Sequence, residues 1–128
     1  MQKIFELCHS NGLHTFMHTC GNVTEIVPDL IEIGLDVLHP IQPYAMDAEY
    51  IVREYGKDLA FFGGIDVQYL LPMGTPEQID MEVRRIIRLF DRPDGGFIAA
   101  CANTIMPETP FENISALFKA LKKYCWRG

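Results

Sequence analysis

Two side chains that can bind a metal ion, His18 and Cys20, lie two residues apart in the run Phe16-Met-His-Thr-Cys-Gly-Asn22. The flanking residues predict a β-strand that ends at this run, and side chains two apart in a strand point the same way. An imidazole nitrogen and a thiolate sulfur side by side suit a zinc ion. The pair taken alone also fits two strand residues that only pack.

Composition places these residues in one globular domain. The chain has 128 residues, 48% hydrophobic and 22% charged, with a formal net charge of −6. This predicts a single domain over residues 1–128 and argues against nucleic acid or an anionic membrane as partner. No apolar run approaches the roughly 20 residues that span a bilayer. Four scattered cysteines form no disulfide framework, so we expect a reduced cytoplasmic protein.

Apolar periodicity predicts strands that alternate with helices. The expected strands cover residues 13–20, 36–39, 59–65 and 97–102. The expected helices cover residues 3–10, 25–33, 48–55, 76–90 and 110–124, with a single turn at 67–71. Thr75-Pro-Glu-Gln78 is a capping box that opens the fourth helix, and Asp47 is expected to cap the third.

Strands that alternate with helices imply a parallel α/β sheet, since parallel strands need helical crossovers. An open doubly wound sheet and part of a (β/α)₈ barrel both fit this order. The open sheet usually carries a glycine-rich phosphate loop after its first strand, and Thr19-Cys-Gly-Asn-Val-Thr24 is not one. Because a full barrel takes about 250 residues, four units in this chain predict half of a barrel.

Polar residues follow each predicted strand, at the edge where both architectures bind ligands. Simpler structural roles stay open: a buried inert thiol for Cys101, a turn residue for His39, an N-cap for Asp66 and a loop cap for Asn103. The convergence predicts a site that contains His18 and Cys20 as candidate metal ligands, together with Cys101 and the candidate substrate-binding residues His39, Asp66 and Asn103.

The chain resembles the C-terminal half of the uroporphyrinogen decarboxylase superfamily, which also contains the cobalamin-dependent (methylcobamide) methyltransferases. The matching runs are His18-Thr-Cys-Gly-Asn22, Leu30-Ile-Glu-Ile-Gly-Leu-Asp-Val-Leu38, Gly63-Gly-Ile-Asp66, Leu71-Pro-Met-Gly-Thr-Pro-Glu77 and Pro107-Glu-Thr-Pro-Phe-Glu-Asn-Ile114. They cover nearly the whole chain in the family's order. The resemblance implies a (β/α)₈ barrel, in agreement with the pattern above.

Within the superfamily, the H-x-C-G run resembles the methyltransferase branch, which uses it with a later cysteine to hold zinc. There the zinc binds a substrate thiol, lowers its pKa and makes a thiolate that takes a methyl group from a methylcorrinoid. This implies zinc, a small-molecule thiol and a corrinoid protein as partners. The family's third-ligand position falls on Asn103 and not on a cysteine. Cys101, two residues earlier on the same strand face, is the expected replacement as the third metal ligand; the alternative is that the metal site is lost.

The resemblance leaves two other functions open. One is uroporphyrinogen decarboxylase itself, a lyase of porphyrin and heme biosynthesis, and the other is an inactive fragment or small binding module. The family's N-terminal half has no counterpart in the sequence, so the activity is expected to be incomplete in this chain alone. An isolated half-barrel leaves unpaired strand edges. We therefore expect two chains to associate and close an eight-stranded barrel with C₂ symmetry.

Overall fold

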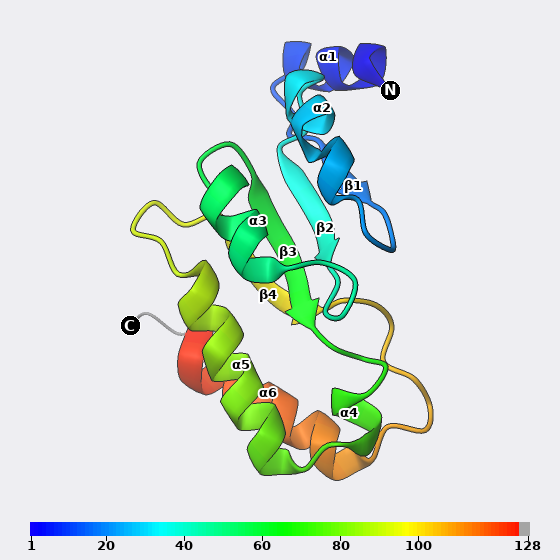
Figure 1. Ribbon diagram of the computed structural model, residues 1–128, viewed down its shortest axis with the longest axis vertical. Coiled ribbons are helices and arrows are strands. Elements are labelled where there is room, and N and C mark those ends of the chain that lie inside the picture. The colour runs from blue at the N-terminus through cyan, green and yellow to red at the C-terminus, as the bar shows by residue number, and fades with distance from the viewer. Residues whose placement is uncertain (126–128) are drawn as a thin grey trace.

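The computed structural model describes residues 1–125, which form a four-stranded sheet in the order β1-β2-β3-β4 (Figure 1). The strands are β1 (Phe16–His18), β2 (Val37–Ile41), β3 (Ala60–Ile65) and β4 (Phe97–Cys101). Each neighbouring pair is parallel. The predicted α/β architecture of consecutive parallel β/α units, half of an eight-stranded barrel, is confirmed.

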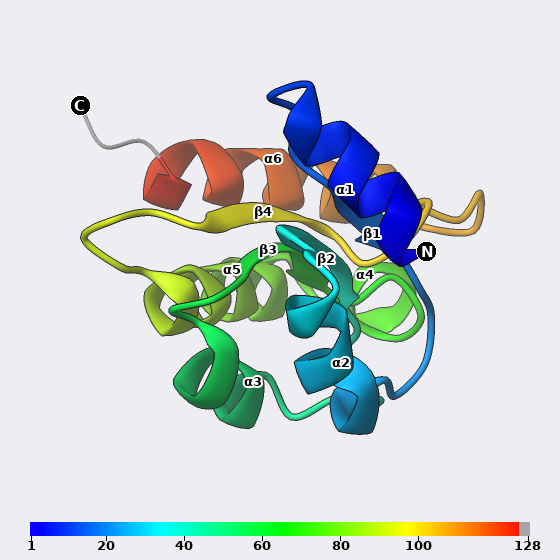
Figure 2. The same ribbon diagram turned by 90° about the horizontal axis from the view of Figure 1, so that it is seen from above.

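Helices precede, connect and follow the strands. They are α1 (Gln2–Ser10), the 3₁₀ turn η1 (Thr24–Ile26), α2 (Val27–Glu32), α3 (Ala48–Tyr55), α4 (Leu70–Met73), α5 (Pro76–Phe90) and α6 (Phe111–Cys125). Helices α2, α3 and α5 lie along one side of the sheet (Figure 2). None of the helices within residues 1–125 combines the length and the apolar composition that crossing a bilayer requires.

The two predicted helix starts are built as their sequences indicate. The Thr75 hydroxyl accepts a hydrogen bond from the Gln78 N–H, and the Gln78 side chain accepts one from the Thr75 N–H. The Asp47 carboxylate accepts the Tyr50 N–H at the start of α3. Each arrangement satisfies backbone donors that the first helical turn leaves unpaired.

Two apolar clusters hold the helices on the sheet. The first joins Leu38 of β2 and Phe61 of β3 to Ile51 of α3 and Phe90 of α5. The second packs residues of β3, α4, α5 and α6 together, namely Ile65, Leu71, Ile79, Val83, Leu117 and Ala120. Most of these side chains are almost wholly buried. Burying one such aliphatic or aromatic side chain stabilises the fold by about 1.5–3 kcal/mol.

The element boundaries differ from the prediction in three places. The first strand is shorter than the expected 13–20, because Thr15 bonds to Gly34 and Asp36 in the turn that precedes β2. The expected helix 25–33 is split into η1 and α2, with Pro28 in the first turn of α2. Strand β2 continues through Pro40 to Ile41, with an irregular register between Leu38 and Ile41.

The amino ends of β1 and β2 are joined by one carboxylate. Asp36 Oδ2 accepts the Thr15 N–H at 2.6 Å and the Thr15 hydroxyl at 3.0 Å, and lies 2.8 Å from His9 Nε2 on α1. Burial acts to raise the pKa of Asp36, but the hydrogen bonds from Thr15 and His9 outweigh it, so the pKa is lowered. This contact lies at the amino ends of the strands, whereas the candidate site lies at their carboxyl ends.

Candidate functional site

Four of the six predicted site residues meet at the carboxyl ends of the strands. Cys20 Sγ lies 3.3 Å from His18 Nε2, and His18 Nδ1 lies 2.7 Å from His39 Nδ1. From the end of β4, Asn103 Nδ2 approaches Cys20 Sγ to 3.9 Å. We call His18, Cys20, His39 and Asn103 the carboxyl-end cluster.

Strand pairing and one loop contact place the cluster. His18, the last residue of β1, is the register partner of His39, which lies in the middle of β2. Cys20 lies beyond the end of β1, where period-2 alternation no longer orients it. Its loop is held instead by Gly21, whose N–H donates to Gln42 Oε1 at 2.9 Å. Gln42, just after β2, is the residue that fixes the loop carrying Cys20.

The His39 ring is set by its neighbours on three strands. It stacks on Phe16 of β1 with ring centroids 5.5 Å apart, and Phe62 of β3 meets it edge-on at 4.8 Å. The backbone of Cys101 in β4 acts to raise the pKa of His39. Burial and the adjacent His18 lower the pKa of His39, against this opposing effect.

A glycine in β3, Gly63, lies beside the His39-Pro40 segment of β2. Gly63 has φ of 114°, in the region that favours glycine. A Cβ at this position would stand 3.3 Å from Pro40 Cβ and 3.5 Å from His39 Cδ2. Any side chain at residue 63 would therefore press on the segment that carries His39.

The other two predicted residues lie outside the cluster. Cys101 packs against the second apolar cluster, on the face where Phe97 of the same strand stacks on Phe90 of α5. Burial raises the pKa of the Cys101 thiol. The Asp66 carboxylate accepts the backbone N–H groups of Gln68, Tyr69 and Leu70, so it caps the short helix α4.

A catalytic zinc takes three protein ligands and leaves one coordination position open. His18 Nε2 and Cys20 Sγ supply two donors. Within residues 1–125, no group of three or more His, Cys, Asp or Glu side chains is arranged to hold a metal ion. The residues that the structure describes therefore do not complete the zinc site that the sequence predicts.

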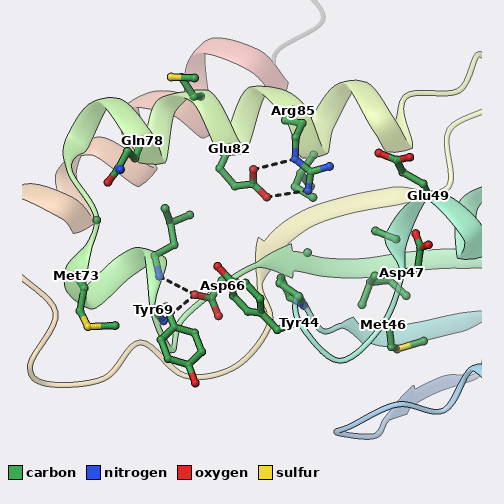
Figure 3. Close-up of a pocket in the computed structure, with 18 residues that line it drawn as sticks. Tyr44, Met46, Asp47, Glu49, Asp66, Tyr69, Met73, Gln78, Glu82 and Arg85 are labelled. Atoms are coloured by element: carbon green, nitrogen blue, oxygen red, sulfur yellow. Dashed lines mark hydrogen bonds and ion pairs between the residues drawn. The ribbon is translucent and has the colours of Figure 1, made fainter.

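Two cavities, which we call hollows, adjoin the carboxyl ends of the strands. The smaller, of about 430 Å³, is lined by Asp66 and Asn103 together with residues such as Gln42, Gln68 and Glu108. The larger, of about 890 Å³, lies between the start of α3 and the helices α4 and α5 (Figure 3). Asp66 lines both of them.

The larger hollow was not anticipated from the sequence. Its rim carries Tyr44 and Tyr69, whose rings meet edge-on with centroids 5.3 Å apart, and an Arg85–Glu82 pair joined by two hydrogen bonds (Figure 3). Tyr44 has φ of 64°, which is uncommon for a residue other than glycine. These residues come from two loops and one helix, and only the Glu82–Arg85 pair has a spacing, three residues on a helix, that the sequence could have indicated.

Most of the chain is similar in sequence to two methyltransferases. The chain is 29% identical over 110 residues to a methylated-thiol–coenzyme M methyltransferase of Methanosarcina mazei, covering 84% of the chain and 27% of that protein. It is 29% identical over 111 residues to the methylcobamide:CoM methyltransferase MtaA of Methanosarcina barkeri, covering 86% of the chain and 31% of that protein. The chain thus spans about a third or less of either relative.

A solved structure and a family profile agree with these matches. The fold superposes on a methyltransferase from Methanosarcina mazei with a TM-score of 0.72 at 23% identity, covering 98% of this chain and 36% of that one. The profile of the uroporphyrinogen decarboxylase (URO-D) family matches residues 1–124. The chain therefore belongs to the uroporphyrinogen decarboxylase family.

Proposed function

We propose that this chain carries the thiol site of a methyltransferase that moves a methyl group from a methylcorrinoid to a thiol. The observation that carries the proposal is the convergence of His18, Cys20 and Asn103 at the carboxyl ends of parallel strands, where barrel enzymes bind their substrates. The two methyltransferase relatives support it, since one is named for methylated thiols and the other for methylcobamide and CoM.

The chemistry sets the demands on the site. A methylcorrinoid would supply an electrophilic methyl group, and the acceptor sulfur reacts as a thiolate because the thiolate is the nucleophile. A carbon–sulfur bond forms, the bond from the methyl carbon to the corrinoid metal breaks with its electron pair left on the corrinoid, and the thiol proton is released. A substrate sulfur in the cluster would accept a hydrogen bond from the Asn103 amide, which already faces the sulfur of Cys20.

The remaining predicted residues take supporting roles in this proposal. His39 holds His18 by the bond between their Nδ1 atoms. Asp66 shapes the loop that lines the hollows, since its oxygens are occupied by backbone N–H groups. The resemblance to the methyltransferase branch implies zinc at His18 and Cys20 as the means of activating the thiol. Because the described residues give it only two ligands, we assign no step to it.

We further propose that a second half-barrel covers the inner face of the sheet. On that face Phe16 is 53% exposed and Ile98 is 56% exposed, and β1 and β4 are the edges of the sheet within residues 1–125. Two copies related by an axis along the barrel would join each β4 to the partner's β1 with all strands parallel. Light scattering at micromolar concentration should report a dimer, and a monomer would contradict this arrangement.

The function is tested by comparing three ligands in calorimetric titrations: coenzyme M as the thiol, methylcobalamin as the corrinoid and uroporphyrin as a polycarboxylate tetrapyrrole. The proposal predicts binding of coenzyme M or methylcobalamin, with coenzyme M binding lost in Cys20→Ala. Binding of uroporphyrin alone would favour the decarboxylase function instead. A folded chain that binds none of the three would be an inactive fragment or a module with another role.

A further inference from the structure

We infer that Asn103 occupies the third ligand position of an otherwise prepared zinc site, so that the single change Asn103→Cys converts a weak two-ligand site into a zinc-binding one. The inference concerns metal binding by the carboxyl-end cluster. It stands or falls separately from the proposed methyl transfer, because its test measures metal and not product.

His18 is already held as a metal ligand would be. The Nδ1 atoms of His18 and His39 lie 2.7 Å apart, so one of them donates to the other, and the direction depends on the tautomer. The direction that suits a metal is the one in which His18 donates its Nδ1–H to His39. That direction leaves the lone pair of His18 on Nε2, the atom that faces Cys20. Metal-binding histidines are fixed in their tautomer by such a partner.

The thiol of Cys20 completes the prepared pair. Its sulfur lies 3.3 Å from His18 Nε2 and its side chain is exposed, so an ion can reach both donor atoms from solvent. A nitrogen and a sulfur this close can ligate the same tetrahedral ion, since zinc binds histidine at about 2.0–2.1 Å and cysteine at about 2.3 Å.

The third position is filled by an amide that turns a donor toward the site. Asn103 Oδ1 accepts the Thr104 N–H at 2.8 Å. A backbone N–H only donates, so the atom that faces it must be the oxygen. The atom 3.9 Å from Cys20 Sγ is therefore the Nδ2 group, which has no lone pair to offer a metal.

No other nearby side chain replaces it. Cys101 packs toward the helices in the second apolar cluster. His39 uses its Nδ1 on His18, and its ring is stacked on Phe16. The Asp66 oxygens hold the start of α4. Residue 103 is thus the position where one new thiolate would reach the same point as His18 and Cys20, and it is exposed enough to accept the change.

The test is a zinc titration against a chromophoric chelator, with Co²⁺ absorption as a count of thiolate ligands. We expect wild type to bind zinc weakly and Asn103→Cys to bind one zinc more than about 100-fold more tightly, because loss of even an outer partner of a metal ligand costs 10–100-fold. The double variant Asn103→Cys/Cys20→Ala should lose the gain. Asn103→Ser removes the amide without adding a strong ligand and should stay weak, and Cys101→Ser should resemble wild type.

Two results would overturn the inference. One is a wild-type chain that binds one zinc as tightly as Asn103→Cys, which would mean that the third ligand is already present. The other is a folded Asn103→Cys chain, by circular dichroism, whose affinity and Co²⁺ spectrum match those of Asn103→Ser.

Discussion

Replacing Gly63 by alanine should disturb the carboxyl-end cluster without replacing any of its side chains. Gly63 has φ of 114°, and a Cβ there would lie 3.3 Å from Pro40 Cβ, 3.4 Å from Pro40 Cα and 3.5 Å from His39 Cδ2. The substitution thus combines an unfavourable backbone conformation with pressure on the residues that end β2.

The size of the effect follows from these two contributions. A residue other than glycine held in such a conformation costs about 1–3 kcal/mol, and forcing a methyl group into a packed region costs about 1–3 kcal/mol. We therefore expect Gly63→Ala to lower the free energy of unfolding by about 2–6 kcal/mol. Gly95 also has positive φ, 81°, but an added Cβ there would meet nothing within 4 Å. Gly95→Ala should cost only the conformational part, about 1–2 kcal/mol.

Urea denaturation of both variants measures this difference. NMR of the imidazole rings then reports on the site, since the bonded Nδ1 proton of His18 should exchange faster with water in Gly63→Ala. Gly64→Ala is the matched control, because its added Cβ would face Ile86 and Phe97 on the helical side. Equal destabilisation by Gly63→Ala and Gly95→Ala, or an unchanged His18 proton in Gly63→Ala, would refute the reasoning.

Three further changes test other parts of the structure. Because the pKa of Asp36 is lowered in the folded protein, its contribution to stability is present above the unfolded carboxyl pKa of about 3.9 and is lost as pH falls through the lower folded pKa. Asp36→Asn should therefore lower the free energy of unfolding by about 1–3 kcal/mol at pH 7 and by much less at pH 2. Urea denaturation at the two pH values measures the difference. Thr75→Ala removes the capping box and should cost about 1 kcal/mol in the same assay, whereas no change would show that the cap is dispensable. His39→Phe keeps an aromatic ring in the stack but removes both nitrogens, so in an Asn103→Cys background it should weaken zinc binding about 10–100-fold; unchanged affinity would contradict the orienting role.

The fold follows from local signals that the sequence carries in full. The capping box at Thr75, the Asp47 cap and the alternation of strand and helix patterns each depend on residues close together in the chain. The boundaries that differ depend on contacts between distant residues. Thr15, for example, bonds to Gly34 and Asp36, some 20 residues later, and no pattern around Thr15 indicates this.

The sequence predicted the position of a site residue only where the strand pattern extends to that residue. His18 and His39 are register partners on neighbouring strands, as the parallel order implies, although β2 runs on to Ile41 and His39 is not at its end. The expectation that Cys101 and Asn103 share a face relied on strand alternation, but β4 ends at Cys101. Beyond that residue the chain turns, so Asn103 approaches Cys20 while Cys101 packs against the helices.

The central claim is that a thiol binds at the carboxyl-end cluster. It is tested most directly by titrating the isotopically labelled chain with coenzyme M and following the backbone amide and histidine ring signals by NMR. The account predicts that the largest shifts fall on Cys20, Gly21, Asn103 and the rings of His18 and His39, and that Cys20→Ala abolishes them. Shifts centred instead on Tyr44, Tyr69 and Arg85 of the larger hollow, or none at saturating coenzyme M, would contradict it.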